Sequence, residues 1–469
     1  MALFCQVVLA DAPRAIDRAW TYRVPPDFSK AMAPGSVLLV PSGTNKQPVR
    51  AYVTEILTQA PEGVPPESIR EIHQLLSDHP VLTGEQLKLA REMRRRYYCS
   101  TADALKAMVP PTVLSAKGRS VQAARLTDPE EAAELLDSDE LKSMKQVRVI
   151  ELLLEHESAP CMEILQATGV SRSVLSTLAK KGVVTLFRKK LELELPAEDA
   201  ASDRPPVLTV EQSEAVDAIG EAAMAAVPGQ LKELLLFGIT GSGKTEVYLH
   251  AAQAVLARGK QVLILVPEIA LTPQITRRLM SRFGKKVAIL HSRLTPSERY
   301  ESWQRVLAQE IPIVVGARSA VFAPLKNLGL IVIDEEQESS YKAEMKPRYY
   351  APDIARIRSI MNGAVLVLGS ATPQVASYRR ALEGTSSLLR LPDRIGEKGL
   401  AEVRIVDMRR EFAKGNLSLF SRSFIETMEH TLDRGEQAMI LLNRRGFSRT
   451  VVCRACGWQM RCPSCDMAL

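Results

Sequence analysis

Continuous apolar runs, separated by helical segments, recur along the chain from about residue 207. The runs are "LLLFG", "VLILVP", "VAIL", "IPIVVG", "LGLIVID" and "AVLVLGS", at 234–238, 262–267, 287–290, 311–316, 328–334 and 364–370. Strands that are apolar throughout are typical of a parallel sheet that is covered on both faces. The pattern therefore predicts an α/β domain over 205–392. After residue 395, "VRIVDM" and "QAMILLNRRGF" predict the start of a second such domain over 393–469.

The preceding 200 residues have a different pattern. Residues 1–112 mix short β-like runs, such as "SVLLVP" and "RAYVTEIL", with one amphipathic helix, "GEQLKLAREMRRRYYC", and predict a small β-rich domain. Within 113–195, "QVRVIELLLEH", "CMEILQATG" and "SRSVLSTLAKKG" predict three short helices, and "VVTLFRKKL" predicts a strand. This order is typical of a winged helix-turn-helix. The stretch "ELPAEDAASDRPPV" then indicates a linker.

Composition narrows the class of protein only slightly. The 469 residues are 46% apolar and 25% charged, as in an ordinary soluble protein, and no run approaches the ~18 apolar residues of a membrane span. The net charge of +7 is compatible with a polyanionic partner, although many basic proteins bind none. We expect a cytoplasmic protein without a membrane partner. Reduced thiols in that compartment favour metal binding over disulfides for clustered cysteines.

A phosphate-binding loop follows the first apolar run. In "LLLFGITGSGKTEVYLH", Gly238 is followed after four residues by Gly243, Lys244 and Thr245, between a predicted strand and a predicted helix. Glycines let backbone N–H groups approach phosphates, Lys244 reaches the outer phosphates, and the Thr245 hydroxyl ligates Mg²⁺. A plain glycine-rich turn would not need both flanks. The residues expected to bind nucleotide here are Gly238, Gly241, Ser242, Gly243, Lys244 and Thr245.

A pair of acidic residues completes the expected hydrolytic site. The run "LGLIVIDEEQ" places Asp334 and Glu335 at the carboxyl end of a buried strand. The first carboxylate suits Mg²⁺, and the second suits orienting or deprotonating an attacking water. Paired acids at a strand end can be a solvated turn, but the phosphate-binding loop upstream disfavours that interpretation. The sequence therefore predicts ATP hydrolysis, with Lys244, Asp334 and Glu335 as catalytic residues and Mg²⁺ as cofactor.

Further motifs resemble the first motor lobe of superfamily-two helicases. "VPEIALTPQ", "GARSAVFAP", "DEEQ" and "GSATP" occur in the order and spacing of that superfamily, at 266–274, 316–324, 334–337 and 369–373. "LTVEQSEAV" matches the upstream segment that reads adenine, and this resemblance places Gln212 at the edge of the base. A P-loop kinase or transporter ATPase would explain neither "GSATP" nor the cysteine pairs at the end of the chain.

The amino-acid sequences in and around these motifs resemble those of the PriA family of replication-restart helicases. The segments that carry the resemblance are "GITGSGKTEVYL", "LHSRLTPSERYESW", "NLGLIVIDEEQESSYK", "PRYY", "LGSATP" and "LLNRRGFS". The resemblance implies a RecA-like P-loop lobe, preceded by a domain for the 3′ end of a nascent strand and by a winged helix. It implies ATP-dependent 3′-to-5′ unwinding at stalled forks and primosome assembly. The partners implied are forked and single-stranded DNA, proteins that load the replicative helicase, and single-strand-binding protein. The resemblance also implies that the protein is a monomer.

The resemblance also places DNA-contacting residues and two departures from the family pattern. Residues that fall where family members contact DNA, or couple it to ATP, are Tyr22, Arg318, Tyr341, Lys342 and Arg348. A solvated loop is the alternative for the last four. Gln337 replaces the histidine of the family's DEEH motif, and Trp20-Thr21-Tyr22 replaces a segment resembling Phe-Asp-Tyr.

The end of the chain carries two Cys-x-x-Cys pairs, Cys453/Cys456 and Cys462/Cys465. Five residues separate the pairs, whereas one zinc ion usually needs a loop of about 12–20 residues between two pairs. The PriA family has four pairs that bind two zinc ions, and these residues match the first two pairs. We therefore expect an incomplete zinc module and a truncated second motor lobe. The alternative to a helicase is a scaffold that binds forks and ATP without productive translocation.

Overall fold

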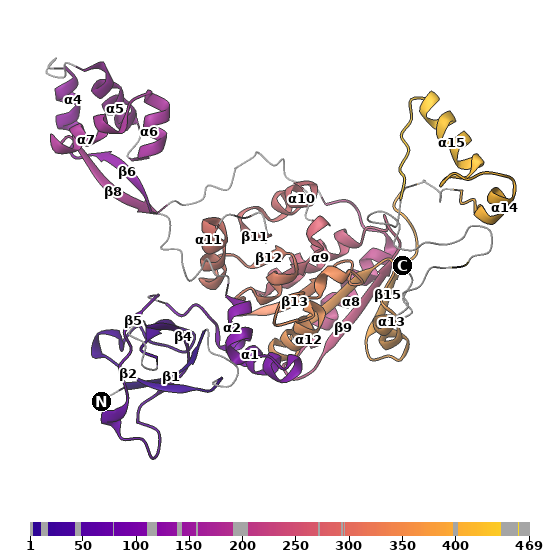
Figure 1. The fold of residues 1–469 in the computed structure, drawn as a ribbon, viewed down its shortest axis with the longest axis horizontal. Helices are drawn as coiled ribbons and strands as arrows, with labels where there is room; N and C mark the ends of the chain where they lie inside the picture. Colours follow the sequence, from indigo (N-terminus) through magenta and orange to yellow (C-terminus); the bar gives the residue numbers. More distant parts are fainter. Residues whose placement is uncertain are drawn as a thin grey trace. The chain divides into compact units, whose positions relative to one another are not determined.

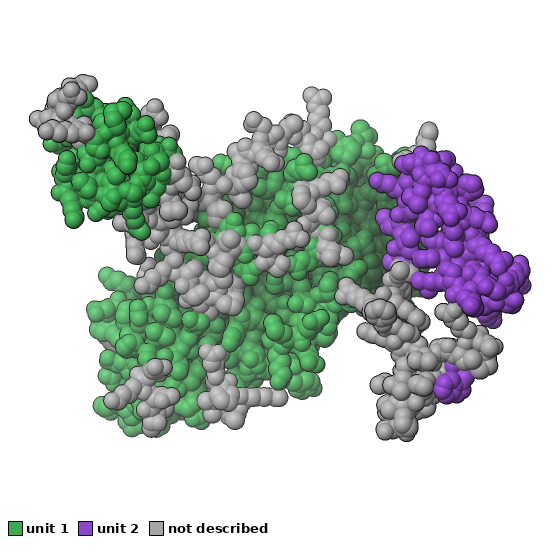
Figure 2. Space-filling model, turned by 45° about the horizontal axis from the view of Figure 1, so that its top comes forward, with its two compact units in different colours: residues 1–396 green, residues 397–469 purple. Residues whose placement is uncertain are grey.

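The computed structural model describes most of the chain. The described residues are 3–10, 17–42, 48–77, 79–109, 120–137, 143–155, 158–190, 205–270, 273–291, 294, 296–396, 402–441 and 458. They divide into two compact units, residues 1–396 and residues 397–469, which Figure 2 colours separately. Within the described residues, no helix is long and apolar enough to cross a bilayer.

The N-terminal region forms an antiparallel sheet followed by two helices. The strands are β1 Leu3–Leu9, β2 Trp20–Val24, β3 Val37–Val40, β4 Val49–Leu57 and β5 Gln74–Leu75, in the order β2-β1-β4-β3-β5. Helices α1 (Gly84–Tyr97) and α2 (Thr101–Met108) both begin at capping boxes, Thr83 with Gln86 and Ser100 with Asp103. These features confirm the predicted mixture of short strands and one long amphipathic helix.

Residues 120–190 form a small separate core. Its elements are β6 Ser120–Leu126, α4 Pro129–Asp137, α5 Met144–Glu155, β7 Ala159–Pro160, α6 Cys161–Thr168, α7 Arg172–Lys180 and β8 Val184–Lys190. The strands pair antiparallel in the order β7-β6-β8. The three predicted helices and the strand after them are present. The polar segment that carries α4 was not predicted as a helix.

A parallel sheet forms the centre of the larger unit (Figure 1). Its strands are β9 Lys232–Gly238, β10 Gln261–Leu265, β11 Val287–Leu290, β12 Ile313–Gly316, β13 Leu328–Ile333, β14 Val365–Ser370 and β15 Ser387–Leu391. In the described part of the chain the order is β11-β12-β10-β13-β14-β9-β15, and each neighbouring pair is parallel. The six apolar runs predicted as buried strands are confirmed.

Helices cover both faces of this sheet. They are α8 Val210–Ala225, α9 Lys244–Leu256, α10 Pro273–Phe283, α11 Pro296–Leu307, α12 Ala351–Asn362 and α13 Val375–Leu382, with short 3₁₀ turns that include η6 Arg318–Phe322 and η7 Ser339–Tyr341. Successive strand residues point to opposite faces, so Leu234 and Leu236 pack with α8, α9 and α10. Leu235 belongs to the opposite cluster, which contains residues of α11, α12, α1 and α2.

This second cluster joins the N-terminal helices to the sheet. Leu89 and Met93 of α1 and Leu105 of α2 are fully buried in the same cluster as Ile354 of α12. Gln86 donates a hydrogen bond to the carbonyl oxygen of Phe322 at 2.8 Å. The hydrophobic core therefore continues across the predicted domain boundary at residue 112.

The smaller unit has two described helices, α14 Met408–Ala413 and α15 Arg422–Asp433. The segments 403–408 and 437–447 were predicted to start a second α/β domain. Their described residues, 403–408 and 437–441, form no strand, and Val403, Ile405 and Met439 are exposed. A strand of a parallel sheet needs a neighbour for its backbone hydrogen bonds, and no described segment of this unit supplies one. The cysteine pairs lie outside the described residues.

Candidate active site

The phosphate-binding loop joins β9 to α9 at the carboxyl edge of the sheet. Gly241 and Gly243 have φ angles of 85° and 81°, a region that favours glycine. Gly243 also caps α9, whose first residue is Lys244, so the free N–H groups of the helix open into the loop. The Lys244 ammonium is buried and donates to the carbonyl oxygen of Gly238 at 2.8 Å. The loop thus has the donors that a phosphate chain requires.

Gln212 braces this loop from the start of α8. Its amide nitrogen donates to the carbonyl oxygen of Ser242 at 2.9 Å, and its amide oxygen accepts from the backbone N–H of Thr209 at 3.0 Å. A Cβ at Gly243 would collide with the Gln212 amide nitrogen, so the glycine also permits this contact. Both ends of the Gln212 amide are engaged within the chain, and its predicted contact with adenine stays a prediction.

Asp334 follows β13 at the same edge of the sheet. One of its carboxylate oxygens, Oδ1, accepts a hydrogen bond from the Tyr248 hydroxyl at 3.0 Å, and its backbone oxygen accepts from the Tyr341 hydroxyl at 2.7 Å. Burial, and then the neighbouring Glu335 charge, raise the pKa of Asp334 to about 6. Burial and the charge of Asp334 raise the pKa of Tyr248 well above its ordinary value, so this hydroxyl stays a donor.

Glu335 lies between the phosphate-binding loop and the segment after β14. It adopts a φ of 47°, which is uncommon for a residue with a side chain, and such strain is concentrated at functional sites. Its Oε1 lies 4.0 Å from the Lys244 ammonium. Its Oε2 accepts from the Gln337 amide at 2.8 Å, and Gln337 in turn accepts from the Ser370 hydroxyl at 2.6 Å. The three predicted catalytic residues are therefore gathered at one place.

Glu336 links the acidic segment after β13 to the end of β14 and the residues that follow it. Its side chain is 1% exposed and accepts from the backbone N–H of Gln374 at 2.7 Å and from the Ser377 hydroxyl at 3.1 Å. The Glu336 backbone N–H donates to the carbonyl oxygen of Gly369 at 3.0 Å. The acidic segment and the "GSATP" segment are consequently held together by several hydrogen bonds.

The donors and acceptors at this edge fit a magnesium–nucleotide complex. Asp334 and Thr245 supply a carboxylate and a hydroxyl, which are hard oxygen ligands of the kind Mg²⁺ prefers. Lys244 and the helix N-terminus supply positive charge beside them. Among the residues the structure describes, no cluster of three or more His, Cys, Asp or Glu side chains suggests a further metal site.

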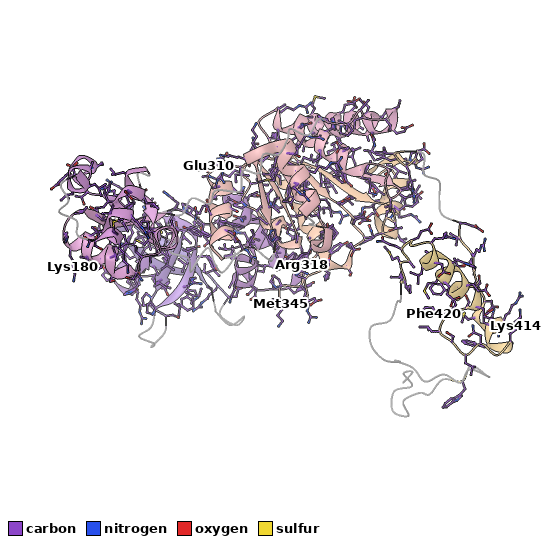
Figure 3. The ribbon with its side chains drawn as sticks, turned by 90° about the horizontal axis from the view of Figure 1, so that it is seen from above. Lys180, Glu310, Arg318, Met345, Lys414 and Phe420 are labelled. Carbon is purple, nitrogen blue, oxygen red and sulfur yellow. The ribbon has the colours of Figure 1, made fainter. Side chains whose placement is uncertain are left out.

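The predicted DNA-contacting residues of the lobe lie on one loop and the turn beside it. Arg318, at the start of η6, donates to the carbonyl oxygens of Ser340 at 3.1 Å and Lys342 at 2.6 Å. The loop itself is mainly basic, and its exposed side chains are those of Lys342, Glu344, Met345, Lys346 and Arg348. Arg318 and Met345 lie on the same side of the lobe in Figure 3. Tyr341 is fully buried against Asp334, so its position suits coupling between the loop and the acidic segment.

Tyr22 of the N-terminal sheet is also buried. It is 6% exposed, and its hydroxyl donates to the carbonyl oxygen of Pro41 at 2.9 Å. The neighbouring Trp20 is half-buried, and the Arg18 guanidinium lies 4.2 Å from the centre of its ring. Trp20 at the start of β2 and Arg18 just before it therefore place an aromatic and a cationic side chain together at the surface.

Two family models match the chain, one in each half of the larger unit. The model of the PriA 3′ DNA-binding domain (3′BD) matches residues 6–110, and the DEAD/DEAH box helicase model matches residues 211–381. The replication restart protein PriA of Bacillus subtilis is 33% identical over 532 aligned positions, which cover 99% of this chain and 65% of that protein.

The chain belongs to the PriA family. Two other PriA proteins are also similar to this chain over about two thirds of its length or nearly all of it. The protein of Synechocystis is 42% identical over a match that covers 66% of this chain and 37% of that protein, and the protein of Haemophilus influenzae is 32% identical over 96% and 60%. The chain spans less than two thirds of the length of these PriA relatives.

Sequence reasoning missed several residues of this PriA site. Tyr248 lies four residues after Lys244 and therefore on the same face of α9, a spacing that could have identified it. Gly369 had a signal only as part of "GSATP". The contacts of Glu336 depend on Gln374 and Ser377, which follow β14, and no local pattern indicates them.

Proposed function

We propose that this chain acts as an ATP-dependent 3′-to-5′ DNA helicase that recognises stalled forks and initiates primosome assembly. The observation that carries the proposal is the convergence of Lys244, Asp334 and Glu335 at the edge where Gln337 meets Ser370. Such a link between the hydrolytic carboxylate and a second motif is what a motor needs to couple ATP to DNA.

The residues have separate roles in this proposal. Lys244 and the first N–H groups of α9 bind the phosphates, while Asp334 and Thr245 hold Mg²⁺. Magnesium, when bound, neutralises charge that develops on the transferred phosphoryl group. Glu335 orients the attacking water and accepts its proton. Gln337 keeps the Glu335 carboxylate in one orientation, and the Lys244 ammonium lies 4.0 Å from its Oε1 atom.

DNA binding is assigned to exposed basic surfaces. The loop with Lys342, Met345 and Arg348 is proposed to contact the translocated single strand, where cations bind phosphates and apolar side chains pack on bases. Residues 120–190 are proposed to be a winged helix that presents Lys180 of α7 to the duplex arm. The N-terminal sheet, with Trp20, is proposed to bind the 3′ end of the nascent strand.

Further partners follow from the family. Cys453, Cys456, Cys462 and Cys465 are proposed as zinc ligands, two ions being bound in the full-length family. The proposed protein partners are those that load the replicative helicase, together with single-strand-binding protein. We propose a monomer that acts in the cytoplasm.

ATP hydrolysis by this chain, with and without forked DNA, tests the proposal. We expect turnover that rises with forked DNA and vanishes in Lys244→Ala. Lys326→Ala removes an exposed lysine before β13 and should leave turnover unchanged. Fork binding without any turnover would replace the helicase by the alternative, a scaffold that binds forks and ATP without productive translocation.

Direction is tested on partial duplexes that offer only a 3′ or only a 5′ single-stranded tail. We expect ATP-dependent displacement of the strand only when the tail allows 3′-to-5′ movement. Equal displacement from both tails, or displacement from the 5′-tailed duplex alone, would contradict the assigned direction.

A further inference from the structure

Tyr248 occupies a position between the two halves of the nucleotide site. It lies one helical turn after Lys244 on α9, is 2% exposed, and directs its hydroxyl at the Oδ1 atom of Asp334, 3.0 Å away. In the described part of the chain, it is the side-chain donor to this carboxylate. The contact therefore joins the helix of the phosphate-binding loop to the expected magnesium ligand.

The space for this hydroxyl is provided by a glycine at the end of β14. A Cβ at Gly369 would overlap the Tyr248 hydroxyl and lie 3.4 Å from Asp334 Oδ1. Any side chain at residue 369 would consequently move the hydroxyl away from the carboxylate. Three separate segments thus meet at one hydrogen bond: helix α9, the end of β13 and the end of β14.

The backbone of Asp334 is held independently of Tyr248. Its N–H donates to the carbonyl oxygen of Leu265 at 2.9 Å, and its carbonyl oxygen accepts from the Tyr341 hydroxyl at 2.7 Å. Removal of the Tyr248 hydroxyl should therefore leave the chain path unchanged. Without this hydrogen bond, the Asp334 carboxylate should be free to rotate about its side-chain bonds.

We propose that Tyr248 is a positioning residue that fixes the Asp334 carboxylate in the orientation that binds nucleotide-bound Mg²⁺. This inference rests on the proposed ATP hydrolysis and deepens it. Groups that hydrogen-bond to a metal ligand orient it, and their loss commonly weakens metal affinity by about 10–100-fold. A neutral hydroxyl suits the role, because it orients the carboxylate without competing for its charge.

The test compares Tyr248→Phe with wild type by titrating Mg²⁺ against binding of a fluorescent ATP analogue. We expect the half-saturating Mg²⁺ concentration to rise about tenfold or more, while binding of the analogue without Mg²⁺ stays the same. The control is Tyr300→Phe on α11, which removes one hydroxyl from a partly buried ring in the other core cluster. The control should keep the wild-type midpoint.

Gly369→Ala provides a second variant that keeps the Tyr248 hydroxyl but displaces it. It should raise the Mg²⁺ midpoint in the same direction as Tyr248→Phe, with folding of both variants checked by circular dichroism. A Tyr248→Phe midpoint within twofold of wild type would overturn the inference while leaving the proposed function in place. A wild-type chain that shows no Mg²⁺-dependent nucleotide binding would remove both.

Discussion

The Ser370 hydroxyl donates a 2.6 Å hydrogen bond to the amide oxygen of Gln337, and the Gln337 amide nitrogen donates to Glu335 at 2.8 Å. The backbone N–H of Thr372 donates to the same Ser370 oxygen at 2.9 Å. A relay of two side chains therefore runs from the "GSATP" segment to the proposed general base. Glutamine can fill this position because its amide donates and accepts at the same time.

Loss of the relay should uncouple DNA from hydrolysis. In Gln337→Ala, we expect DNA-stimulated ATP turnover to fall about tenfold, since one hydrogen bond to a charged group contributes about 1.5–3 kcal/mol. The KM for ATP should be little changed, because Gln337 does not line the phosphate-binding loop. Steady-state assays with and without single-stranded DNA check this. An equal fall in basal and stimulated rates would contradict a coupling role.

Glu335→Gln should separate nucleotide binding from hydrolysis. The amide keeps the shape of the side chain but cannot accept a proton, so we expect turnover to fall by about 10²–10⁴-fold. Affinity for the ATP analogue should stay close to that of wild type. Single-turnover hydrolysis and analogue binding, measured on the same sample, distinguish these effects. Turnover above a tenth of the wild-type rate would assign the base to another group.

The raised pKa of Asp334 gives the metal-free protein a characteristic pH dependence. The pKa rises from 3.8 to about 6 on folding, so between these values the folded state binds more protons than the unfolded state. The free energy of unfolding therefore falls as pH rises through that window, by about 3 kcal/mol in total at about 1.4 kcal/mol per unit. Below pH 4 the neutral carboxyl carries no such penalty.

Asp334→Asn should remove this dependence. We compare the free energy of unfolding of the variant with that of wild type at each pH. The difference in favour of the variant should be about 3 kcal/mol larger at pH 7 than at pH 4. Urea denaturation with a chelator present measures the difference, and Asp393→Asn at an exposed position controls for the general effect of pH. A constant difference between Asp334→Asn and wild type across this range would contradict the prediction.

Arg358 and Glu85 form a buried ion pair between α12 and α1. Arg358 is 0% exposed and makes two 2.8 Å hydrogen bonds to the Glu85 carboxylate. Glu85→Ala would leave the buried guanidinium without its carboxylate, with only the carbonyl oxygen of Val321 as acceptor among the described residues, and should lower the free energy of unfolding by about 3–5 kcal/mol. The control Glu92→Ala removes a surface ion pair of the same helix and should cost under about 1 kcal/mol. Chemical denaturation gives both values, and equal losses would refute the assignment.

The regular parts of the fold were accessible from sequence because each depends on a local pattern. Six buried strands and the phosphate-binding loop carry their own signals, as apolar runs and as glycines before Lys244. The seventh strand, β15, was missed because the exposed residues Ser387 and Arg390 leave only two consecutive apolar residues between them. A strand without a continuous apolar run lacks the signal by which the other six were predicted.

Contacts between distant segments could not be predicted in the same way. Glu85 and Arg358 are 273 positions apart in the sequence, and the sequence around each residue does not indicate the other as its partner. Tyr341 shows a related difficulty, because an aromatic residue beside lysines suggests a DNA surface, while its hydroxyl is directed inward at Asp334. Burial of one side chain depends on packing that a short motif does not encode.

The two accessory regions differ in how freely evolution or engineering could exchange them. The hydrophobic core of residues 120–190 consists of residues of that segment alone. We therefore expect that this segment can be lost or replaced without loss of the parallel-sheet domain. Leu89, Met93 and Leu105 of the N-terminal helices instead share a core with the parallel sheet. A graft of the parallel-sheet domain onto another N-terminal domain would therefore have to carry α1 and α2 with it.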